Sequence, residues 1–526
     1  MNTRPNILLI LNDDMGFSDL GCYGGEIETP HLDRLAENGL RYTQFYNTAR
    51  CCPSRASLLT GLHPHQADVG HMMNDDDIDG YLGDLNANTV TLAEALGCGG
   101  YRCYMSGKWH VTRHIRDAQH NWPCQRGFHD FYGTLNGCGN FFNPGTLIRN
   151  NNPIQAEGDS YYTTDAFTDE TIRQLREHHE NHSEKPFFQY LAYTAPHWPL
   201  HAHPEDIEKY KGRFDEGWDV LREKRLERLK QSGILPEACD LSDRDETVPP
   251  WADAPDKAWQ ARRMEVYAAQ LDRMDQGIGR VLQTLEELDQ LDNTLILFLS
   301  DNGGCAEELL TDNAFWARKA DEEAIATATT RTGDPVQFGN APDLLPGGEN
   351  TYASYGTEWA NLSNTPFRLY KHWVHEGGIA TPFIVHWPAG IDTPGKLRTQ
   401  PAQLPDIMAT LLDLAQTDYP ETYNDHPVQP CEGFSMVPTF GNQPFDRDIL
   451  CWEHEGNRAV RKGNWKLVSK YPGEWELYNL ETSRSETQNC AAEHPDRVAE
   501  LTAYYTEWAE RCHVRPWDEL LELRKG

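Results

Sequence analysis

Short apolar runs, separated by longer polar stretches, predict a mostly parallel β-sheet in this chain. Four runs have the length and composition of buried strands, at residues 6–11, 187–193, 295–299 and 382–387. Polar residues follow the first three: Asp13 and Asp14, then His197, then Asp301 and Asn302. Ligands bind beyond the carboxyl ends of strands in open α/β sheets, so we expect these side chains to meet at one edge.

The segments between the strands predict helices and one long loop region. Residues 258–288 carry apolar side chains at helical spacing, which predicts an amphipathic helix packed on the sheet. The charged stretch 206–231 predicts a helix with a solvated face. Residues 311–364 are rich in Gly, Asn, Thr and Pro and predict a loop region that walls a pocket.

The pattern changes near residue 445. Residues 458–470 and 475–480 then predict antiparallel strands, and 495–511 predict a closing amphipathic helix. A chain of 526 residues is also too long for one hydrophobic core. We therefore expect a catalytic domain at 1–445 and a smaller α+β domain at 446–526.

Composition narrows the classes of partner. Lys and Arg number 47 and Asp and Glu 81, so the net charge is −34, which disfavours nucleic acid and anionic membranes as partners. No apolar run approaches the length of a membrane span, and the run after Pro5 is too short for a signal peptide, so we expect a cytoplasmic protein. The 13 scattered cysteines predict mostly reduced thiols.

The residues that follow the first and third strands offer only oxygen ligands. Asp13, Asp14, Asp301 and Asn302 together carry a charge near minus three, which favours Ca²⁺ or Mg²⁺ over zinc. Either pair alone is more typical of a helix cap or a turn. Their shared position beyond strand ends favours a metal site.

A second cluster of candidate residues starts at Cys51. The segment 51–55 reads Cys-Cys-Pro-Ser-Arg and continues to Leu-Thr-Gly at 59–61, between a predicted strand at 40–46 and a short helix. The helix dipole would stabilise an anion at Cys51. A buried structural thiol is the alternative interpretation.

This segment strongly resembles the type I sulfatase family of the alkaline-phosphatase superfamily, closest to its bacterial arylsulfatases. In that family Cys-x-Pro-Ser-Arg followed by Leu-Thr-Gly marks a cysteine that is converted to formylglycine. Further matches occur in the family's order, at residues 12–16, 107–110, 196–199, 300–304 and 371–378. The resemblance implies a large mixed, mostly parallel sheet sandwiched by helices, with a smaller C-terminal domain of antiparallel sheet and helix, and it suggests a bacterial origin.

The resemblance also implies the site residues. Cys51 would be converted by a formylglycine-generating enzyme, and the hydrate would attack the sulfur of a sulfated small molecule or glycan. Ca²⁺, with Mg²⁺ as the alternative ion, would be bound by Asp13, Asp14, Asp301, Asn302 and the modified Cys51. Arg55 would hold the hydrate and Lys108 and Lys371 the sulfate oxygens, His110 would trigger sulfate release, and His197 would protonate the leaving oxygen.

Two other functions fit parts of this pattern. A phosphate or phosphonate monoester hydrolase of the same superfamily shares the sheet and the metal. A non-catalytic binder of sulfated glycans would leave Cys51 unmodified, but it would not need Arg55 or His110. The leaving-group pocket is predicted from variable segments, with Trp198, His201, His454 and Glu455 as its walls.

Overall fold

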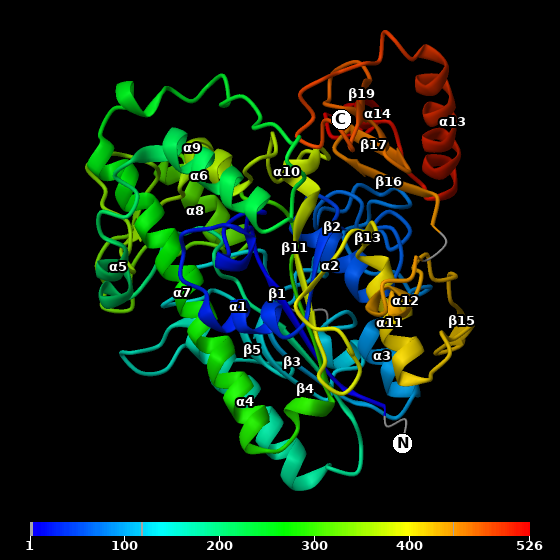
Figure 1. Ribbon diagram of the computed structural model, residues 1–526. Coiled ribbons are helices and arrows are strands. Elements are labelled where there is room, and N and C mark those ends of the chain that lie inside the picture. Colours follow the sequence, from blue (N-terminus) through cyan, green and yellow to red (C-terminus); the bar gives the residue numbers. More distant parts are fainter. Residues whose placement is uncertain (1–3, 117–118, 445–446, 526) are drawn as a thin grey trace.

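The computed structural model describes residues 4–116, 119–444 and 447–525. An eleven-stranded sheet forms the centre of the molecule (Figure 1). Its central strands are β8 (Thr294–Ser300), β1 (Asn6–Asn12), β7 (Phe187–Ala192) and β3 (Arg102–Lys108), in that order. They run parallel, and β1, β7 and β8 are apolar runs buried on both faces, which is typical of parallel sheets.

The outer strands make the sheet mixed. They are β2 (Leu40–Tyr46), β4 (Asp130–Thr134), β5 (Leu147–Arg149), β6 (Asn152–Pro153), β11 (Ala380–His386), β12 (Lys396–Arg398) and β13 (Ala402–Gln403). β11 pairs antiparallel with both β8 and β2, and β5 pairs antiparallel with β4. The four predicted strands are therefore confirmed as β1, β7, β8 and β11, and the expected mixed, mostly parallel sheet is present.

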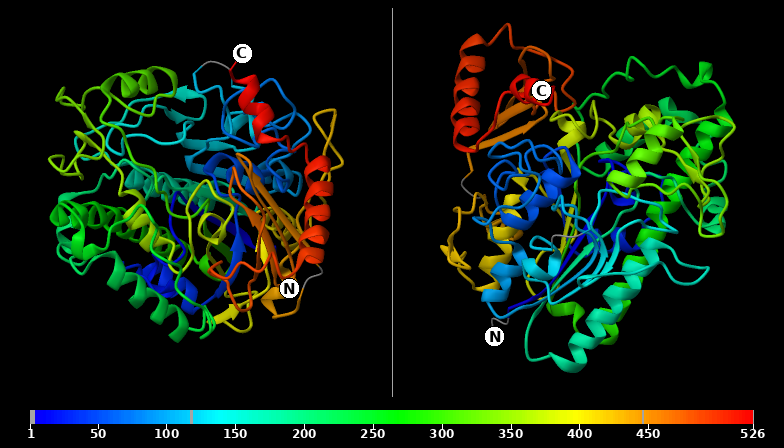
Figure 2. Two further views of the ribbon diagram at one scale, coloured as in Figure 1. Left: turned by 90° about the horizontal axis from the view of Figure 1, so that it is seen from above. Right: turned by 180° about the vertical axis from the view of Figure 1, so that it is seen from behind.

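Helices cover both faces of this sheet (Figures 1 and 2). One face carries α1 (Pro30–Glu37), α4 (Thr163–Asn181) and α7 (Lys257–Glu287), and the other carries α2 (Cys51–Thr60), α3 (Leu92–Cys98), α11 (Pro405–Ala415) and α12 (Val437–Phe440). The strand period of two sends Leu8 and Ile10 of β1 to the first core and Ile7, Leu9 and Leu11 to the second.

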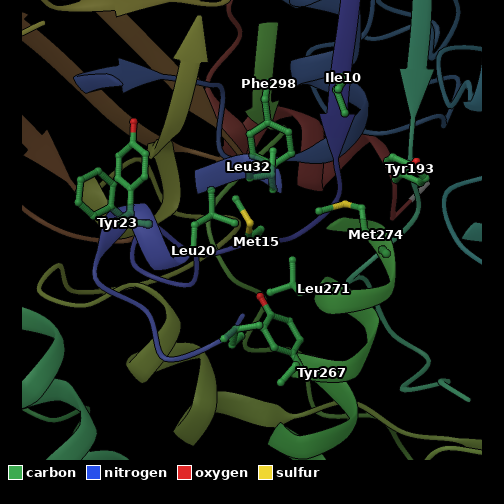
Figure 3. Close-up of a cluster of buried hydrophobic side chains, with 14 of the residues drawn as sticks. Ile10, Met15, Leu20, Tyr23, Leu32, Tyr193, Tyr267, Leu271, Met274 and Phe298 are labelled. Atoms are coloured by element: carbon green, nitrogen blue, oxygen red, sulfur yellow. The ribbon is translucent and has the colours of Figure 1, made fainter. Parts of the chain in front are cut away.

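Figure 3 shows part of the first core. Leu271 and Met274 of α7 lie beneath Ile10 of β1 and Phe298 of β8. All four side chains are fully buried. The predicted amphipathic helix at 258–288 is thus confirmed as α7, and its burial stabilises the strands that carry the site by about 25 cal/mol for each Å² of apolar surface removed from water.

Two predicted segments differ from the structure. The charged stretch 206–231 forms two helices, α5 (Pro204–Tyr210) and α6 (Gly217–Gln231). Its face is not wholly solvated, because Arg225 is fully buried against Asp19. The region 311–364 is not all loop, since it contains α8 (Asn313–Glu322), β9 (Gln337–Phe338), β10 (Thr351–Tyr352) and α9 (Gly356–Ser363). Composition alone did not predict the buried face of the first segment or the helices and strands of the second. Contacts with distant parts of the chain stabilise these elements, whose own helix or strand propensity is weak.

The C-terminal part is a four-stranded antiparallel sheet with a helix against it, as expected. It comprises β16 (Ile449–His454), β17 (Asn457–Lys462), β18 (Trp465–Ser469), β19 (Glu476–Asn479) and α13 (Pro495–Arg511), followed by α14 (Trp517–Leu523). The single strand predicted at 458–470 is a hairpin, which turns at Gly463 with a φ of 60°. The predicted boundary at 445–446 lies outside the described residues.

A buried ionic cluster joins this sheet to the larger part. Lys466 of β18 contacts Glu376 at 3.0 Å and Glu486 at 2.8 Å, and all three side chains are fully buried. Glu376 is the first residue of α10 (Glu376–Ile379), which leads into β11.

Of the helices that the structure describes, none is long and apolar enough to cross a membrane. The remaining short strands are β14 (Thr422–Tyr423) and β15 (His426–Pro427).

Candidate active site

The carboxyl ends of β1 and β8 bring the predicted oxygen ligands together. The two strands are parallel neighbours in a register that pairs Asn12 with Ser300, so the residues that follow them lie side by side. Asn302 donates its amide hydrogen to Asp14 Oδ1 at 2.6 Å, and the Asp14 backbone N–H points to Asp301 Oδ1 at 3.3 Å. Asp13 lies in the same cluster, and all of these side chains are buried.

The cluster fits a hard cation. Asp13 Oδ1 and Asn302 Oδ1 are buried oxygens with no hydrogen-bond partner among the described residues. Burial and the neighbouring Asp13 carboxylate raise the pKa of Asp301 well above its usual range. Three carboxylates and an amide in a dry site are the ligand type that Ca²⁺ and Mg²⁺ prefer, and a divalent ion would relieve the crowding of negative charge.

Three buried cations surround the carboxylates. Arg55 donates to Asp301 Oδ2 from Nε and Nη2 at 3.1 and 2.8 Å. Lys108 Nζ contacts Asp13 Oδ2 at 2.6 Å, and Lys371 Nζ contacts Asp14 Oδ2 at 2.9 Å. Each carboxylate is thereby paired with at least one cation, and Asp13 also lies 3.7 Å from Arg55 Nη2. The structure thus brings together all three predicted cationic residues.

Cys51 is the first residue of α2, at the positive end of the helix dipole. The strand β2 and the pairing of its end with β11 and β13 hold this helix start in place, and every residue of α2 is buried. A hydrogen bond from Cys52 lowers the pKa of Cys51 well below its usual range, and Lys108, His110 and Lys371 lower it further. The surroundings therefore stabilise a negative charge at this position.

Two of the predicted histidines flank Cys51 and the carboxylates. His197 donates a hydrogen bond from Nδ1 to the Trp198 carbonyl oxygen at 2.6 Å, so its Nε2 faces the site, 3.2 Å from Lys371 Nζ and 3.3 Å from Asp14 Oδ2. His110 Nδ1 has no partner in the part of the chain that the structure describes. Burial lowers the pKa of His110, so its ring is a neutral base near pH 7.

A cavity of about 810 Å³ opens above these groups. Cys51, His110, His197 and Lys371 line its floor. The predicted wall residues Trp198 and Glu455 line it as well.

The structure corrects the prediction for the other two wall residues. His201 and His454 are fully buried and are not among the described lining residues. The His201 ring bonds to the Thr351 carbonyl oxygen at 2.6 Å, in the packing beneath the cavity. His454 Nε2 lies 3.6 Å from Glu455 Oε1.

Sequence patterns missed several residues of the cavity wall, among them Arg50, His71 and Glu307. Glu307 accepts hydrogen bonds from Arg50 Nη1 at 2.9 Å and from Trp198 Nε1 at 2.8 Å. Burial favours the neutral acid, but Lys371 and Arg50 outweigh it and hold the pKa of Glu307 below its usual range. The local sequence offered one indication that Glu307 lies near the site, its position five residues after Asn302.

Comparisons with known proteins agree with this geometry. The model of the sulfatase family matches residues 5–417, and that of the N-sulphoglucosamine sulphohydrolase C-terminal region matches residues 367–508. The chain belongs to the sulfatase family. This sulfatase is thus a sulfuric ester hydrolase with the fold of the alkaline-phosphatase superfamily, as the resemblance in the sequence implied.

Individual relatives cover nearly the whole chain. An uncharacterized sulfatase of Schizosaccharomyces pombe is 35% identical over 95% of this chain and 93% of its own length. The arylsulfatase of Klebsiella aerogenes is 32% identical over 82% of this chain and 91% of its own. A crystal structure of Ps i-CgsB in complex with k-i-k-neocarrahexaose, 24% identical, has a TM-score of 0.67 and covers 96% of this chain and 93% of its own.

Proposed function

We propose that this sulfatase hydrolyses sulfate monoesters with a formylglycine made from Cys51 and a calcium ion held by the strand-end oxygens. The supporting observation is the placement of Cys51. It begins a helix, and it interacts electrostatically with the buried cations Arg55, Lys108 and Lys371 and with the buried carboxylates of the cluster. A formylglycine-generating enzyme would carry out the conversion. This two-electron oxidation replaces the thiol by an aldehyde, releases the sulfur as sulfide and needs an electron acceptor.

Asp13, Asp14, Asp301 and Asn302 would hold the calcium ion together with the modified Cys51. When bound, the ion polarises a sulfate oxygen and lowers the pKa of the nucleophilic hydroxyl. Three carboxylates and three cations leave the bare cluster close to neutral. With a divalent ion the charge becomes about +2, which a sulfate ester and a deprotonated nucleophile, each −1, would neutralise.

The side chains of this chain would then carry the reaction. One hydroxyl of the formylglycine hydrate attacks sulfur as the bond from sulfur to the leaving oxygen breaks. Lys108 and Lys371 hold the sulfate oxygens where negative charge develops. His197 keeps the hydrogen on Nδ1 that it donates to the Trp198 carbonyl, and its doubly protonated ring would give the second hydrogen, on Nε2, to the leaving oxygen.

Release of sulfate would depend on His110. Its neutral ring accepts the proton of the second hydroxyl, the aldehyde forms again, and the carbon–oxygen bond to sulfate breaks. Arg55, fixed by Asp301 and by the Lys108 carbonyl oxygen at 3.0 Å, holds the hydrate in place. No water attack on the sulfated intermediate is required.

The outer part of the cavity favours an aryl or alkyl leaving group over a polyanionic glycan. Its apolar lining consists of Met72, Met73, Ile115, Trp198, Leu309, Leu310, Phe315, Trp316 and Ile325. Five carboxylates also line the cavity, from Glu307, Glu308, Glu322, Glu323 and Glu455. Four cations line it too, Arg50, Arg113, Lys319 and Lys371, so the lining carries one negative charge in excess, which disfavours a leaving group with further sulfate or carboxylate groups.

Two variants test the nucleophile. Cys51→Ala should abolish turnover of an aryl sulfate, whereas Cys52→Ala, at the variable position of the conversion motif, should retain it. The mass of the tryptic peptide that contains Cys51 should show an aldehyde or its hydrate in the wild type. Near-wild-type activity of Cys51→Ala, or an unmodified peptide from a fully active preparation, would refute the mechanism.

Substrate panels separate the remaining functions. An aryl phosphate or phosphonate ester turned over with a kcat/KM above that of the matching aryl sulfate would make the enzyme a phosphate or phosphonate monoester hydrolase. Tight binding of a sulfated glycan with no turnover of any ester would make it a binding protein.

A further inference from the structure

Three imidazoles surround the carboxylate of Glu455 on the cavity wall. His71 Nε2 lies 2.7 Å from Glu455 Oε1, His372 Nδ1 lies 3.0 Å from Oε2, and His454 Nε2 lies 3.6 Å from Oε1. His71 comes from the chain after α2, His372 from the segment before α10, and His454 and Glu455 from the end of β16 and its turn. None of these four side chains takes part in the bond-breaking and proton-transfer steps of the proposed hydrolysis.

The three rings have different roles. Arg524 Nη2 lies 2.7 Å from His71 Nδ1, and a guanidinium can only donate, so His71 Nδ1 is an acceptor. Its hydrogen is then on Nε2, which donates to Glu455. His71 is therefore a positioning residue that orients the carboxylate, as outer hydrogen-bond donors do around metal ligands.

His454 lacks a partner of its own. Its side chain is fully buried, and neither ring nitrogen has a hydrogen-bond partner among the residues that the structure describes. A buried polar group left without a hydrogen-bond partner destabilises the fold. His454 does not line the cavity, so a bulky substrate would not reach it, whereas a single ion would.

The spacing of the nitrogen and oxygen atoms fits such an ion. One ligand atom each from His372, His454 and Glu455 lies within 4.8 Å of the others. Zinc–nitrogen and zinc–oxygen bonds of about 2.0–2.2 Å hold ligand atoms about 3–4 Å apart. His372 Nδ1 lies 3.0 Å from Glu455 Oε2 and His454 Nε2 lies 3.6 Å from the other carboxylate oxygen, Oε1, so each imidazole has a carboxylate oxygen at that spacing. Two imidazoles and one carboxylate suit zinc and its neighbours rather than calcium.

We propose that His372, His454 and Glu455 bind a divalent transition-metal ion of the zinc class on the wall of the active-site cavity. Nearby cations are already paired, Arg50 with Glu307 and Arg524 with Asp76. Because Glu455 also lines the cavity, the ion would lie beside the space that takes the leaving group. This second metal site is distinct from the calcium site in ligand type and does not depend on conversion of Cys51.

The test is zinc titration of the full-length protein with calcium supplied, with zinc content measured by mass spectrometry. We expect one zinc ion per chain, with stoichiometric binding abolished in His454→Ala and in His372→Ala. His71→Ala should lower zinc affinity by about 10- to 100-fold, the effect of losing an outer partner. Cobalt(II) should give a visible absorption spectrum in the wild type that His454→Ala removes.

His120→Ala is the matched control. His120 belongs to a surface group with Asp84 and His114 that also has metal-ligand spacing, and its side chain is 58% exposed. Zinc should be retained in His120→Ala. Loss of zinc in this variant, or no stoichiometric zinc in the wild type, would overturn the proposal. Calcium content and aryl-sulfate turnover, measured on the same samples, report separately on the proposed hydrolysis and on folding of the variants.

Discussion

Lys371→Ala tests the role of the buried cations most directly. Lys371 Nζ contacts Asp14 Oδ2 at 2.9 Å and His197 Nε2 at 3.2 Å, and its side chain is 2% exposed. Loss of one preorganised donor to a developing anion costs about 2.7–4 kcal/mol, a factor of about 10² to 10³ in kcat. The expected loss in kcat/KM for an aryl sulfate is therefore at least 100-fold, at about 2.7 kcal/mol.

The same substitution should affect stability. It leaves the buried Asp14 carboxylate without its ammonium partner, and breaking a buried ion pair costs about 3–5 kcal/mol. Added calcium should restore part of that loss, since the proposed ion contacts the same carboxylate. Thermal unfolding with and without calcium measures this difference.

Lys319→Ala provides the control. Lys319 also lines the cavity, but it pairs with Glu323 on the surface of α8, where an exposed ion pair contributes about 0–1 kcal/mol. Its loss should change kcat/KM less than about fivefold. A folded Lys371→Ala variant whose kcat/KM matches that of Lys319→Ala would refute the assignment of Lys371 to the sulfate site.

Three further predictions concern other parts of the chain. Gly137→Ala should lower kcat with little effect on stability, because the added Cβ would lie 2.7 Å from His110 Nε2; unchanged kinetics would contradict the placement of that ring. Burial raises the pKa of Asp275 to about 7, from 3.8 in the unfolded chain. The protonated side chain therefore adds to the free energy of unfolding in full below pH 3.8, and this contribution is lost as pH rises through 7, by up to about 1.36 kcal/mol per pH unit. In Asp275→Asn the midpoint of urea unfolding should vary less with pH between 4 and 8 than it does in the wild type. The same pH dependence in both proteins would count against the raised pKa. Moderate salt should not lower kcat/KM for an aryl sulfate, because it screens the repulsion from a net charge of −34; a steep fall would show that local attraction dominates.

The central strands and the site residues beyond them could be predicted from the sequence because both depend on local patterns. A continuous apolar run such as β8 is buried wherever it lies in the sheet, and Asp301 must follow its end. Cys51, Arg55 and the lysines came from a resemblance rather than from spacing, since a lone lysine has the same local pattern on any surface. Their ion pairs appear only in the folded chain.

Other residues could not be predicted because their partners are distant in the chain. Glu307 is defined by Arg50 and Trp198, and Glu455 by His71 and His372. His201 has the same sequence context as a pocket residue, two positions after a proline turn, yet its ring faces the Thr351 carbonyl inside the protein. Whether a side chain faces a cavity or the core depends on the register of segments that contact it.

The burial of α2 limits when Cys51 can be modified. Every residue from Cys51 to Thr60 is buried, and the strand before it pairs with β11, more than 300 positions later in the chain. A maturation enzyme could not bind this segment once β11 has paired with β2 and α2 is buried. The proposed oxidation therefore has to occur while the nascent polypeptide is still emerging or unfolded, and a cell that folds this chain faster than it can be oxidised would accumulate a well-folded but inactive product.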